Sequence, residues 1–436
     1  MKQTLHLQSP KNWINDPNGF LYYRGQYHLF YQYFPYDLRW GMMHWGHAVS
    51  QDLVNWKHLP IALFPTVKED RDGCFSGSAV EKEGQMHLFY TGVHYRQVNP
   101  RNIHECIPGE MEASQLKLVS TDGMTFDNFG GKQVVIPKIV DEMFGDCGDT
   151  RDPKVWRGQD GWYLILGSTL QRKKGMLLVY RSEDLEHFTL LNRVCDDRFG
   201  WLWECPDYFE TEGGGVFLFS PIGLQMEDGK EEQQAVCMPA LFSEQTGELE
   251  LAQDIQFVDY GLDLYAPQTN IDEAGRRTMI AWMRMPEPVL GEWIGMFCYP
   301  RVVRRRGEHI YFSLHPNVKE RFCKPIFTPE EAEGREYVVH TELENGGQLD
   351  IGGYHIMRKG MQIYTDRRGL FPEGRGHLLC HTPDLREGCS LSVYVSDHLI
   401  EVFINDGEYV ISNIVYDMGN RMEVQGGRGT VLYTIE

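Results

Sequence analysis

The sequence of 436 residues lacks the features that mark membrane, zinc-binding and disulfide-stapled proteins. It contains no run of 18 apolar residues that could span a membrane, and its first residues, MKQTLHLQSPKNW, include no apolar signal core. Its ten cysteines form no Cys-x-x-Cys pair, so neither zinc spacing nor the pattern of a small secreted module is present. We therefore expect free thiols, a cytoplasmic protein, and neither a metal nor another cofactor.

Positive charge is also scarce. The 42 Lys and Arg residues face 62 Asp and Glu residues, which gives a formal net charge of −20. Such a field repels phosphate backbones and anionic lipid surfaces, so we expect no nucleic acid and no membrane as partners. Aromatic residues, in contrast, make up 12% of the chain, which suits both an all-β core and a site lined by flat side chains.

One pattern recurs five times. It consists of a short motif whose residues could act in a functional site, here called the loaded motif, then a strand, a glycine-bearing turn and an apolar strand. The apolar strands are HLFY at 28–31 and 87–90, YLIL at 163–166, FLFS at 217–220 and MIAW at 279–282. The copies follow one another at intervals of about 60 residues, with few helix-period segments between them. This spacing predicts four-stranded sheets repeated around an axis, a five-bladed β-propeller, with an irregular β-sandwich as the alternative.

The repeat stops near residue 315, and the remaining chain has a different pattern. Residues 316–324 have the composition of a connector, and residues 325–436 show alternating strands separated by Gly, Asp and Asn turns. We therefore expect an all-β chain with a propeller over residues 1–315 and a C-terminal antiparallel β-sandwich over 325–436. The sandwich has no cluster of acids, so we expect a structural role and treat it as a candidate surface for homo-oligomerisation.

The loaded motifs occupy equivalent positions in the five copies. Each precedes the second residue of its apolar strand by 12 to 14 residues, and the equivalent residues are Asp16, Phe75, Asp152, Glu204 and Pro267. The first strand of each propeller blade lines the central axis, so these residues should surround one axial pocket. Residues 95–115, which lengthen one copy, should form a long loop at the rim of that pocket.

Three acids in one pocket indicate a specific chemistry. Each carboxylate raises the pKa of its neighbours, which suits glycoside hydrolysis, where one carboxyl stays protonated while another is ionised. Arg151, beside Asp152, can keep one of them anionic. A calcium site is the alternative, but calcium favours acids that are clustered in one loop.

Three motifs resemble those of a known family. WINDPNG at 13–19, TRDPKVW at 150–156 and WECPDYF at 203–209 are similar to the three acidic motifs of glycoside hydrolase family 32, the invertases, sucrose-6-phosphate hydrolases and fructanases. The resemblance spans nearly the whole chain. It implies a retaining hydrolase that releases terminal non-reducing β-D-fructofuranosyl residues from sucrose, sucrose 6-phosphate or short fructo-oligosaccharides. It also implies that Asp16 is the nucleophile, Glu204 the acid/base and Asp152 a transition-state stabiliser.

A small-molecule sugar is therefore the expected partner. The substrate-binding residues that the motif contexts indicate are Asn15, Gln32, Trp40, Phe75, Ser76, Arg151, Tyr265 and Trp282. A fructosyltransferase with the same acids, a non-catalytic sugar-binding propeller and an inverting arabinose-type furanosidase are the alternatives. The sequence leaves open whether the aglycone is glucose, glucose 6-phosphate or fructose.

Overall fold

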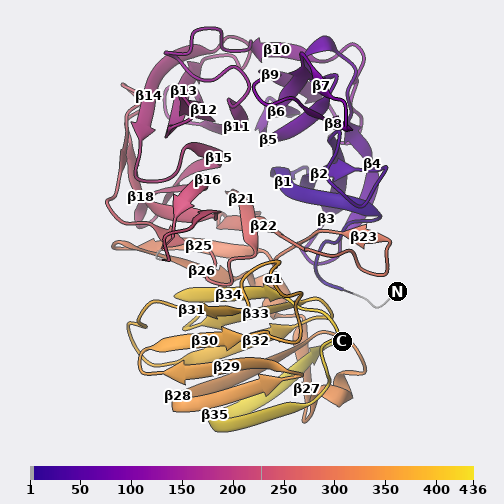
Figure 1. The fold of residues 1–436 in the computed structure, drawn as a ribbon, viewed down its shortest axis with the longest axis vertical. Helices are drawn as coiled ribbons and strands as arrows, with labels where there is room; N and C mark the ends of the chain where they lie inside the picture. Colours follow the sequence, from indigo (N-terminus) through magenta and orange to yellow (C-terminus); the bar gives the residue numbers. More distant parts are fainter. Residues whose placement is uncertain (1–3, 227) are drawn as a thin grey trace.

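The computed structural model describes residues 4–226 and 228–436, which form two β-rich domains (Figure 1). Five separate sheets surround an axis in the first domain, and one sheet of nine strands forms the second. The inner strands of neighbouring blades contact one another around the axis, where Figure 1 labels them β1, β5, β11, β15 and β21. The predicted all-β fold, a five-bladed propeller followed by a C-terminal antiparallel β-sandwich, is confirmed, with the C-terminal strands joined in one nearly closed sheet.

The strands of each blade follow one another outwards from the axis. The first blade contains β1 (Asn12–Tyr23), β2 (Gln26–Phe34), β3 (His44–Ser50) and β4 (Lys57–Leu63), and the second contains β5 (Gly73–Lys82), β6 (Gln85–Tyr95), β9 (Met111–Ser120) and β10 (Gln133–Ile136). The third contains β11 (Arg151–Arg157), β12 (Trp162–Leu170), β13 (Lys174–Ser182) and β14 (Thr189–Asp196). The fourth contains β15 (Leu202–Thr211), β16 (Gly214–Gln225), β18 (Val236–Phe242) and β19 (Leu249–Leu251), with β17 (Glu231–Gln233) and β20 (Gln256–Phe257) beside them. The fifth contains β21 (Leu264–Ile271), β22 (Arg277–Met283), β25 (Arg301–Arg306) and β26 (His309–Leu314), with β24 (Met296–Phe297) beside β22.

The five apolar repeats are the second strands of the blades: β2, β6, β12, β16 and β22. Their central residues are buried because neighbouring blades cover both faces of each sheet. Glycine allows the tight reversal that precedes them. Gly25 and Gly84 have φ of 79° and 77° in two-residue turns that join β1 to β2 and β5 to β6.

The ring closes where the first and fifth blades meet. The backbone N–H of Phe20 donates to Oε1 of Gln268 at 2.9 Å, and Nδ2 of Asn270 donates to the Phe20 carbonyl at 2.6 Å. A short parallel pairing between β1 and β23 (Trp293–Ile294) adds backbone bonds at the same junction. These contacts fasten the N-terminal part of the chain to the last blade.

A short helix, α1 (Pro316–Lys319), leads into the C-terminal domain. Its sheet consists of β27 (Phe322–Ile326), β28 (Tyr337–Ile351), β29 (Tyr354–Lys359), β30 (Gln362–Asp366), β31 (Leu379–His381), β32 (Ser390–Val395), β33 (Leu399–Ile404), β34 (Tyr409–Ile414) and β35 (Met422–Ile435). The long strand β28 pairs with β29, β32 and β35, so the strands form one continuous sheet around an apolar core. β27 begins at Phe322, within the segment 316–324 that the sequence predicts as a connector.

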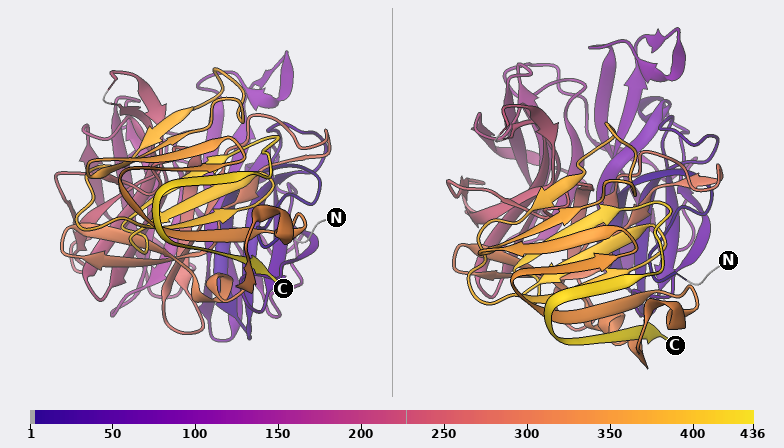
Figure 2. Two further views of the ribbon diagram at one scale, coloured as in Figure 1. Left: turned by 90° about the horizontal axis from the view of Figure 1, so that it is seen from below. Right: turned by 60° about the horizontal axis from the view of Figure 1, so that its bottom comes forward.

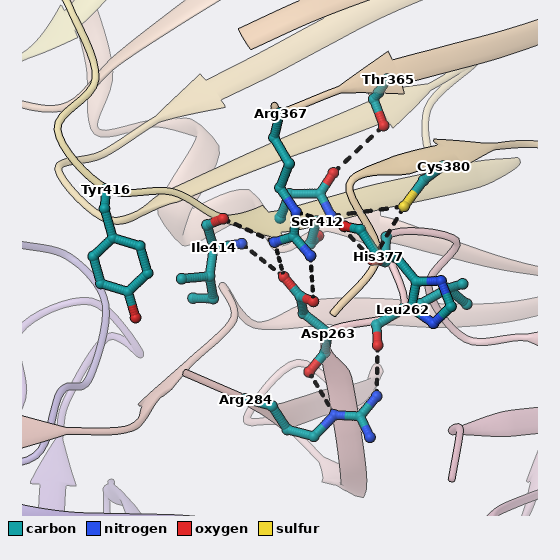
Figure 3. A network of polar contacts seen from close by, with 12 residues as sticks. Leu262, Asp263, Arg284, Thr365, Arg367, His377, Cys380, Ser412, Ile414 and Tyr416 are labelled. Atoms are coloured by element: carbon teal, nitrogen blue, oxygen red, sulfur yellow. Dashed lines mark hydrogen bonds and ion pairs between the residues drawn. The ribbon is translucent and has the colours of Figure 1, made fainter. Parts of the chain in front are cut away.

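The C-terminal domain packs against the propeller next to the fifth blade (Figure 1), and Figure 2 shows it from below, in front of the propeller. One apolar cluster contains Ile310 and Phe312 of β26 together with Phe403 and Val410 of the C-terminal sheet. Charged groups cross the same interface. Figure 3 shows one such network, in which the guanidinium of Arg367 binds both carboxylate oxygens of Asp263. Within the described ranges, no helix has the length and apolar character that crossing a membrane requires.

Candidate active site

Each of the five inner strands is irregular at its loaded motif. The pairing with the second strand shifts register between residues 14 and 17, 74 and 77, 151 and 154, 204 and 207, and 265 and 268. A bulge of this kind redirects side chains, here towards the axis. Asp152, Cys205 and Ala266 have φ of 64°, 47° and 49° at these bulges, a strained conformation for residues other than glycine. Such strain is concentrated at functional sites.

The bulges surround one axial pocket of about 460 Å³, to which all eleven predicted site residues contribute. They are Asn15, Asp16, Gln32, Trp40, Phe75, Ser76, Arg151, Asp152, Glu204, Tyr265 and Trp282. The pocket thus unites residues from all five blades, as the equivalent positions in the repeat predict.

Asp16 is half-buried and accepts hydrogen bonds from two neighbouring side chains. The Ser76 hydroxyl donates to Oδ2 of Asp16 at 2.6 Å, and Nδ2 of Asn15 donates to Oδ1 at 3.1 Å. Asn15 is itself fixed, because the Trp13 indole N–H donates to its amide oxygen at 2.8 Å. Burial raises the pKa of Asp16, whereas the hydrogen bond from Ser76 opposes the increase.

Glu204 is held by two donors, one at each carboxylate oxygen. Nε of Arg151 donates to Oε1 at 3.1 Å, and the Tyr265 hydroxyl donates to Oε2 at 2.7 Å. Arg151 also binds Asp149 at 2.9 Å, which limits its movement. Burial and, next, the charge of Glu204 raise the pKa of Tyr265 well above its ordinary value, so the phenol remains a donor. The carboxyl of Glu204 therefore has a defined orientation.

Asp152 is the third acid, and its carboxylate accepts a hydrogen bond from the backbone N–H of Cys205 at 2.9 Å. Burial, followed by the charge of Glu204, raises the pKa of Asp152 to about 7, although Arg151 opposes this shift. The three acids share a single cation among the residues that line the pocket. The pocket is thus suited to stabilise positive charge that develops in a bound molecule.

Aromatic rings form the walls of the pocket. Trp40 and Phe75 meet edge to face with centroids 5.8 Å apart, and Trp13 and Trp282 meet similarly at 5.9 Å. The indole nitrogen of Trp282 is buried and has no hydrogen-bond partner within the described part of the chain. A buried donor of this kind can serve a ligand oxygen. Gln32 is fixed by a bond of 3.1 Å from Nε2 to the Cys74 carbonyl.

Six residues that line the pocket were not among the predicted site residues. They are Trp13, Tyr95, Glu105, Cys106, Met111 and Gln233. Four of these belong to residues 95–115, the segment predicted to form a loop at the rim; it contains a small hairpin of β7 (Val98–Asn99) and β8 (Asn102–Cys106). Trp13 begins the WINDPNG motif, which was a usable signal, whereas no motif marks Gln233 in the short strand β17.

Known proteins share this architecture. A model of the glycosyl hydrolases family 32 N-terminal domain matches residues 6–316. The chain is 33% identical to the sucrose-6-phosphate hydrolase of Escherichia coli and 30% identical to the raffinose invertase of the same species, in each case over 96% of this chain and 90% of the relative. The structure of a mutant of the Bombyx mori GH32 beta-fructofuranosidase, in complex with sucrose, is similar with a TM-score of 0.81 and 28% identity, covering 100% of this chain and 94% of that one. The chain therefore belongs to glycoside hydrolase family 32 and is a glycosidase of the β-fructofuranosidase type.

Proposed function

We propose that the chain is a retaining β-fructofuranosidase in which Asp16 is the nucleophile, Glu204 the acid/base and Asp152 the transition-state stabiliser. The convergence of these three acids at bulges around one pocket is the observation that carries the proposal. Its products are fructose and the released aglycone.

In the first step, a carboxylate oxygen of Asp16 forms a bond to the anomeric carbon of the fructosyl unit. The bond from that carbon to the glycosidic oxygen breaks, and Glu204 transfers its proton to this oxygen. Arg151 and Tyr265 orient Glu204 for the transfer. The donors from Asn15 and Ser76 orient Asp16 for its attack.

In the second step, Glu204 removes a proton from water, whose oxygen attacks the anomeric carbon and breaks its ester bond to Asp16. Positive charge develops on the sugar ring in both steps. Asp152 stabilises this charge and accepts or donates hydrogen bonds at the ring hydroxyls. Gln32 and the Trp282 indole supply further polar contacts, and Trp40 and Phe75 exclude water from the ring.

Substrates with a neutral or a phosphorylated aglycone are both represented among the relatives, since one is named a sucrose-6-phosphate hydrolase and another a raffinose invertase. We therefore propose sucrose, sucrose 6-phosphate and short fructo-oligosaccharides as the substrate range. The test compares initial rates on sucrose, sucrose 6-phosphate, 1-kestose and inulin.

Three results together would support the proposal. The wild-type protein should release free fructose, Asp16→Asn should not release it, and the exposed control Asp197→Asn should release it like the wild type. Transfer products in place of free fructose at high sucrose would favour a fructosyltransferase. Sugar binding without turnover would favour a non-catalytic propeller. Either outcome would contradict the proposed hydrolysis.

A cytoplasmic location and assembly through the C-terminal domain also remain proposals. All ten cysteines are unpaired, which fits a reducing compartment. Cell fractionation would test the location, and analytical ultracentrifugation would test the oligomeric state.

A further inference from the structure

A second pocket lies at the opposite end of the propeller axis. The inner strands begin at the active site and continue to this second pocket, so one strand serves both: β11 carries Asp152 near its start and Trp156 near its end, and β15 carries Glu204 and then Phe209. We call it the basal pocket. It has a volume of about 380 Å³, and its walls include the aromatic side chains of Trp156, Trp162, Tyr208, Phe209 and Phe242.

The basal pocket is separated from the active site by a constriction that leaves only about 10 Å³ of free space. Three prolines line this constriction: Pro267, which is the loaded residue of its blade, and Pro153 and Pro206, which follow Asp152 and Glu204. Ser76 and Asp152 border it towards the active site, and Lys154 is shared with the basal pocket. A molecule in the basal pocket therefore cannot reach the catalytic acids.

Positive charge is in excess at the floor of the basal pocket. The buried ammonium of Lys154 donates to Oδ2 of Asp207 at 2.9 Å and to the Thr269 carbonyl at 2.6 Å. The side chain of Arg277, in contrast, makes no ion pair or hydrogen bond with any residue that the structure describes, and its Nε is buried without a partner. Its guanidinium carbon lies 4.8 Å from the centroid of the Phe209 ring. Asp207 is thus the one acid whose charge favours both cations, and it forms an ion pair only with Lys154.

The rim of the basal pocket carries acids that are engaged locally. Glu81 accepts a hydrogen bond from the Gly84 backbone N–H, Glu244 accepts one from the Gln159 backbone, and Glu210 accepts one from Tyr208. An acidic rim repels a large polyanion such as a nucleic acid. A small anion can still pass the rim and reach the cations at the floor.

We propose that the basal pocket is a binding site for a small oxyanion, the phosphate or carboxylate group of a metabolite, with the guanidinium of Arg277 as its principal ligand. Arginine recognises such groups through paired charge-assisted hydrogen bonds. Arg277 is half-buried and has no counter-ion of its own, which is costly for the folded protein, and a bound anion reduces that cost. The aromatic walls leave room for an uncharged body attached to the anion.

Isothermal titration calorimetry with inorganic phosphate, at an ionic strength kept constant with chloride, tests the proposal. The wild-type protein should show saturable binding of one phosphate. Arg277→Met keeps the contact with Phe209 but removes the charge, so binding should become at least tenfold weaker. Arg157→Met is the matched control, because Arg157 is an exposed arginine of the same pocket that stacks on Trp162, and this variant should bind like the wild type.

Thermal unfolding provides a second readout that does not depend on calorimetric heat. Arg277→Met should unfold in chloride at a temperature equal to or above that of the wild type, and phosphate should no longer raise that temperature. Parallel titrations with acetate and glucose 6-phosphate separate a carboxylate, free phosphate and phosphorylated sugar as the source of the anion. No anion response in the wild type, or an equal response in Arg277→Met, would overturn the proposal. Sucrose hydrolysis takes place in the axial pocket and not in the basal pocket. A failure of the anion-binding proposal would therefore leave the proposed enzymatic function intact.

Discussion

Buried charges are arranged in opposite ways at the domain interface and in the axial pocket. At the interface, fully buried Arg301 binds Asp259 at 2.8 Å and Glu401 at 2.7 Å. In the axial pocket, Arg151 is the only cation for Asp16, Asp152 and Glu204 among the lining residues that the structure describes. The comparison indicates that compensated charges hold the two domains in register, whereas uncompensated charges destabilise the pocket and equip it for catalysis.

The pKa shifts of Glu401 and Asp152 show the same difference, although burial outweighs Arg301 at Asp259 and raises the pKa of that acid. Burial alone raises the pKa of Glu401, but Arg301 and His6 outweigh burial and lower it below its ordinary value. Burial raises the pKa of Asp152 to about 7, because Glu204 adds to the effect and Arg151 only partly opposes it. Depth alone therefore does not decide the protonation of a carboxyl group in this protein. Its neighbours do.

The largest expected effect is a loss of catalytic activity in the pocket without a loss of the fold. Asp16→Asn or Glu204→Gln should lower kcat/KM for sucrose by about 10³-fold or more, because each removes a group that forms or breaks a bond. Thermal unfolding should occur at the wild-type temperature or above it, since one of the mutually repelling charges of the pocket is lost. Either variant with more than a tenth of wild-type turnover would contradict the assigned role.

The second effect is a loss of stability at the domain interface without a loss of activity in the pocket. Arg301→Met leaves Asp259 and Glu401 buried without their cation, so the free energy of unfolding should fall by about 3–5 kcal/mol. Denaturant unfolding measures the loss, and kcat/KM per folded molecule should stay unchanged. Arg304→Met, at a half-exposed position on the same strand, is the control and should cost little. A comparable loss of stability in Arg301→Met and Arg304→Met would contradict the special role of the buried ion pairs at the interface.

The third effect concerns the pH dependence of stability. The pKa of Asp152 is about 7 in the folded protein and 3.8 ordinarily, so the folded state binds more protons than the unfolded state between these values. The contribution of Asp152 to wild-type stability should therefore decline as pH rises from about 4 to 7. Asp152→Asn lacks this decline, so its advantage should grow across that window to a few kcal/mol and then level off. Denaturant unfolding at several pH values measures the stability difference between Asp152→Asn and the wild type. A difference that stays constant with pH would contradict the raised pKa of Asp152.

The smallest effect concerns the unpaired indole of Trp282. Trp282→Phe keeps an aromatic wall but removes the N–H, which should raise KM for sucrose several-fold, equivalent to about 1 kcal/mol. The value of kcat should change by less than a factor of about three. Steady-state kinetics with the wild type as reference measures both. An unchanged KM would show that the N–H does not contact the substrate.

The sequence predicts the site well because repeat geometry and catalytic geometry coincide. Asp16, Asp152 and Glu204 stand at equivalent places, and each lies at the bulge of an inner strand, so counting from the apolar strands was sufficient to place them together. Gln233 could not be found in this way, because it reaches the pocket from the short strand β17, which lies outside the repeat. The unpaired state of the Arg277 side chain depends on which residues lie near it in the folded protein. No sequence pattern contains that information.

Pairing within the C-terminal domain was also beyond the sequence pattern. Alternation of apolar and polar residues identifies strands, but it does not say that β28 pairs with three others. β27 begins three residues before the predicted start at 325, and the pattern does not mark it because Phe322–Ile326 reads FCKPI, which is short and has three exposed central residues.

The stereochemistry of the first-formed fructose tests the central claim most directly. If Asp16 forms a bond to the anomeric carbon and water then displaces it, rapid proton and carbon NMR of sucrose hydrolysis should show β-D-fructofuranose before the ring forms equilibrate. Release of the α-anomer first would mean a single displacement by water, and it would contradict the role of Asp16 as nucleophile.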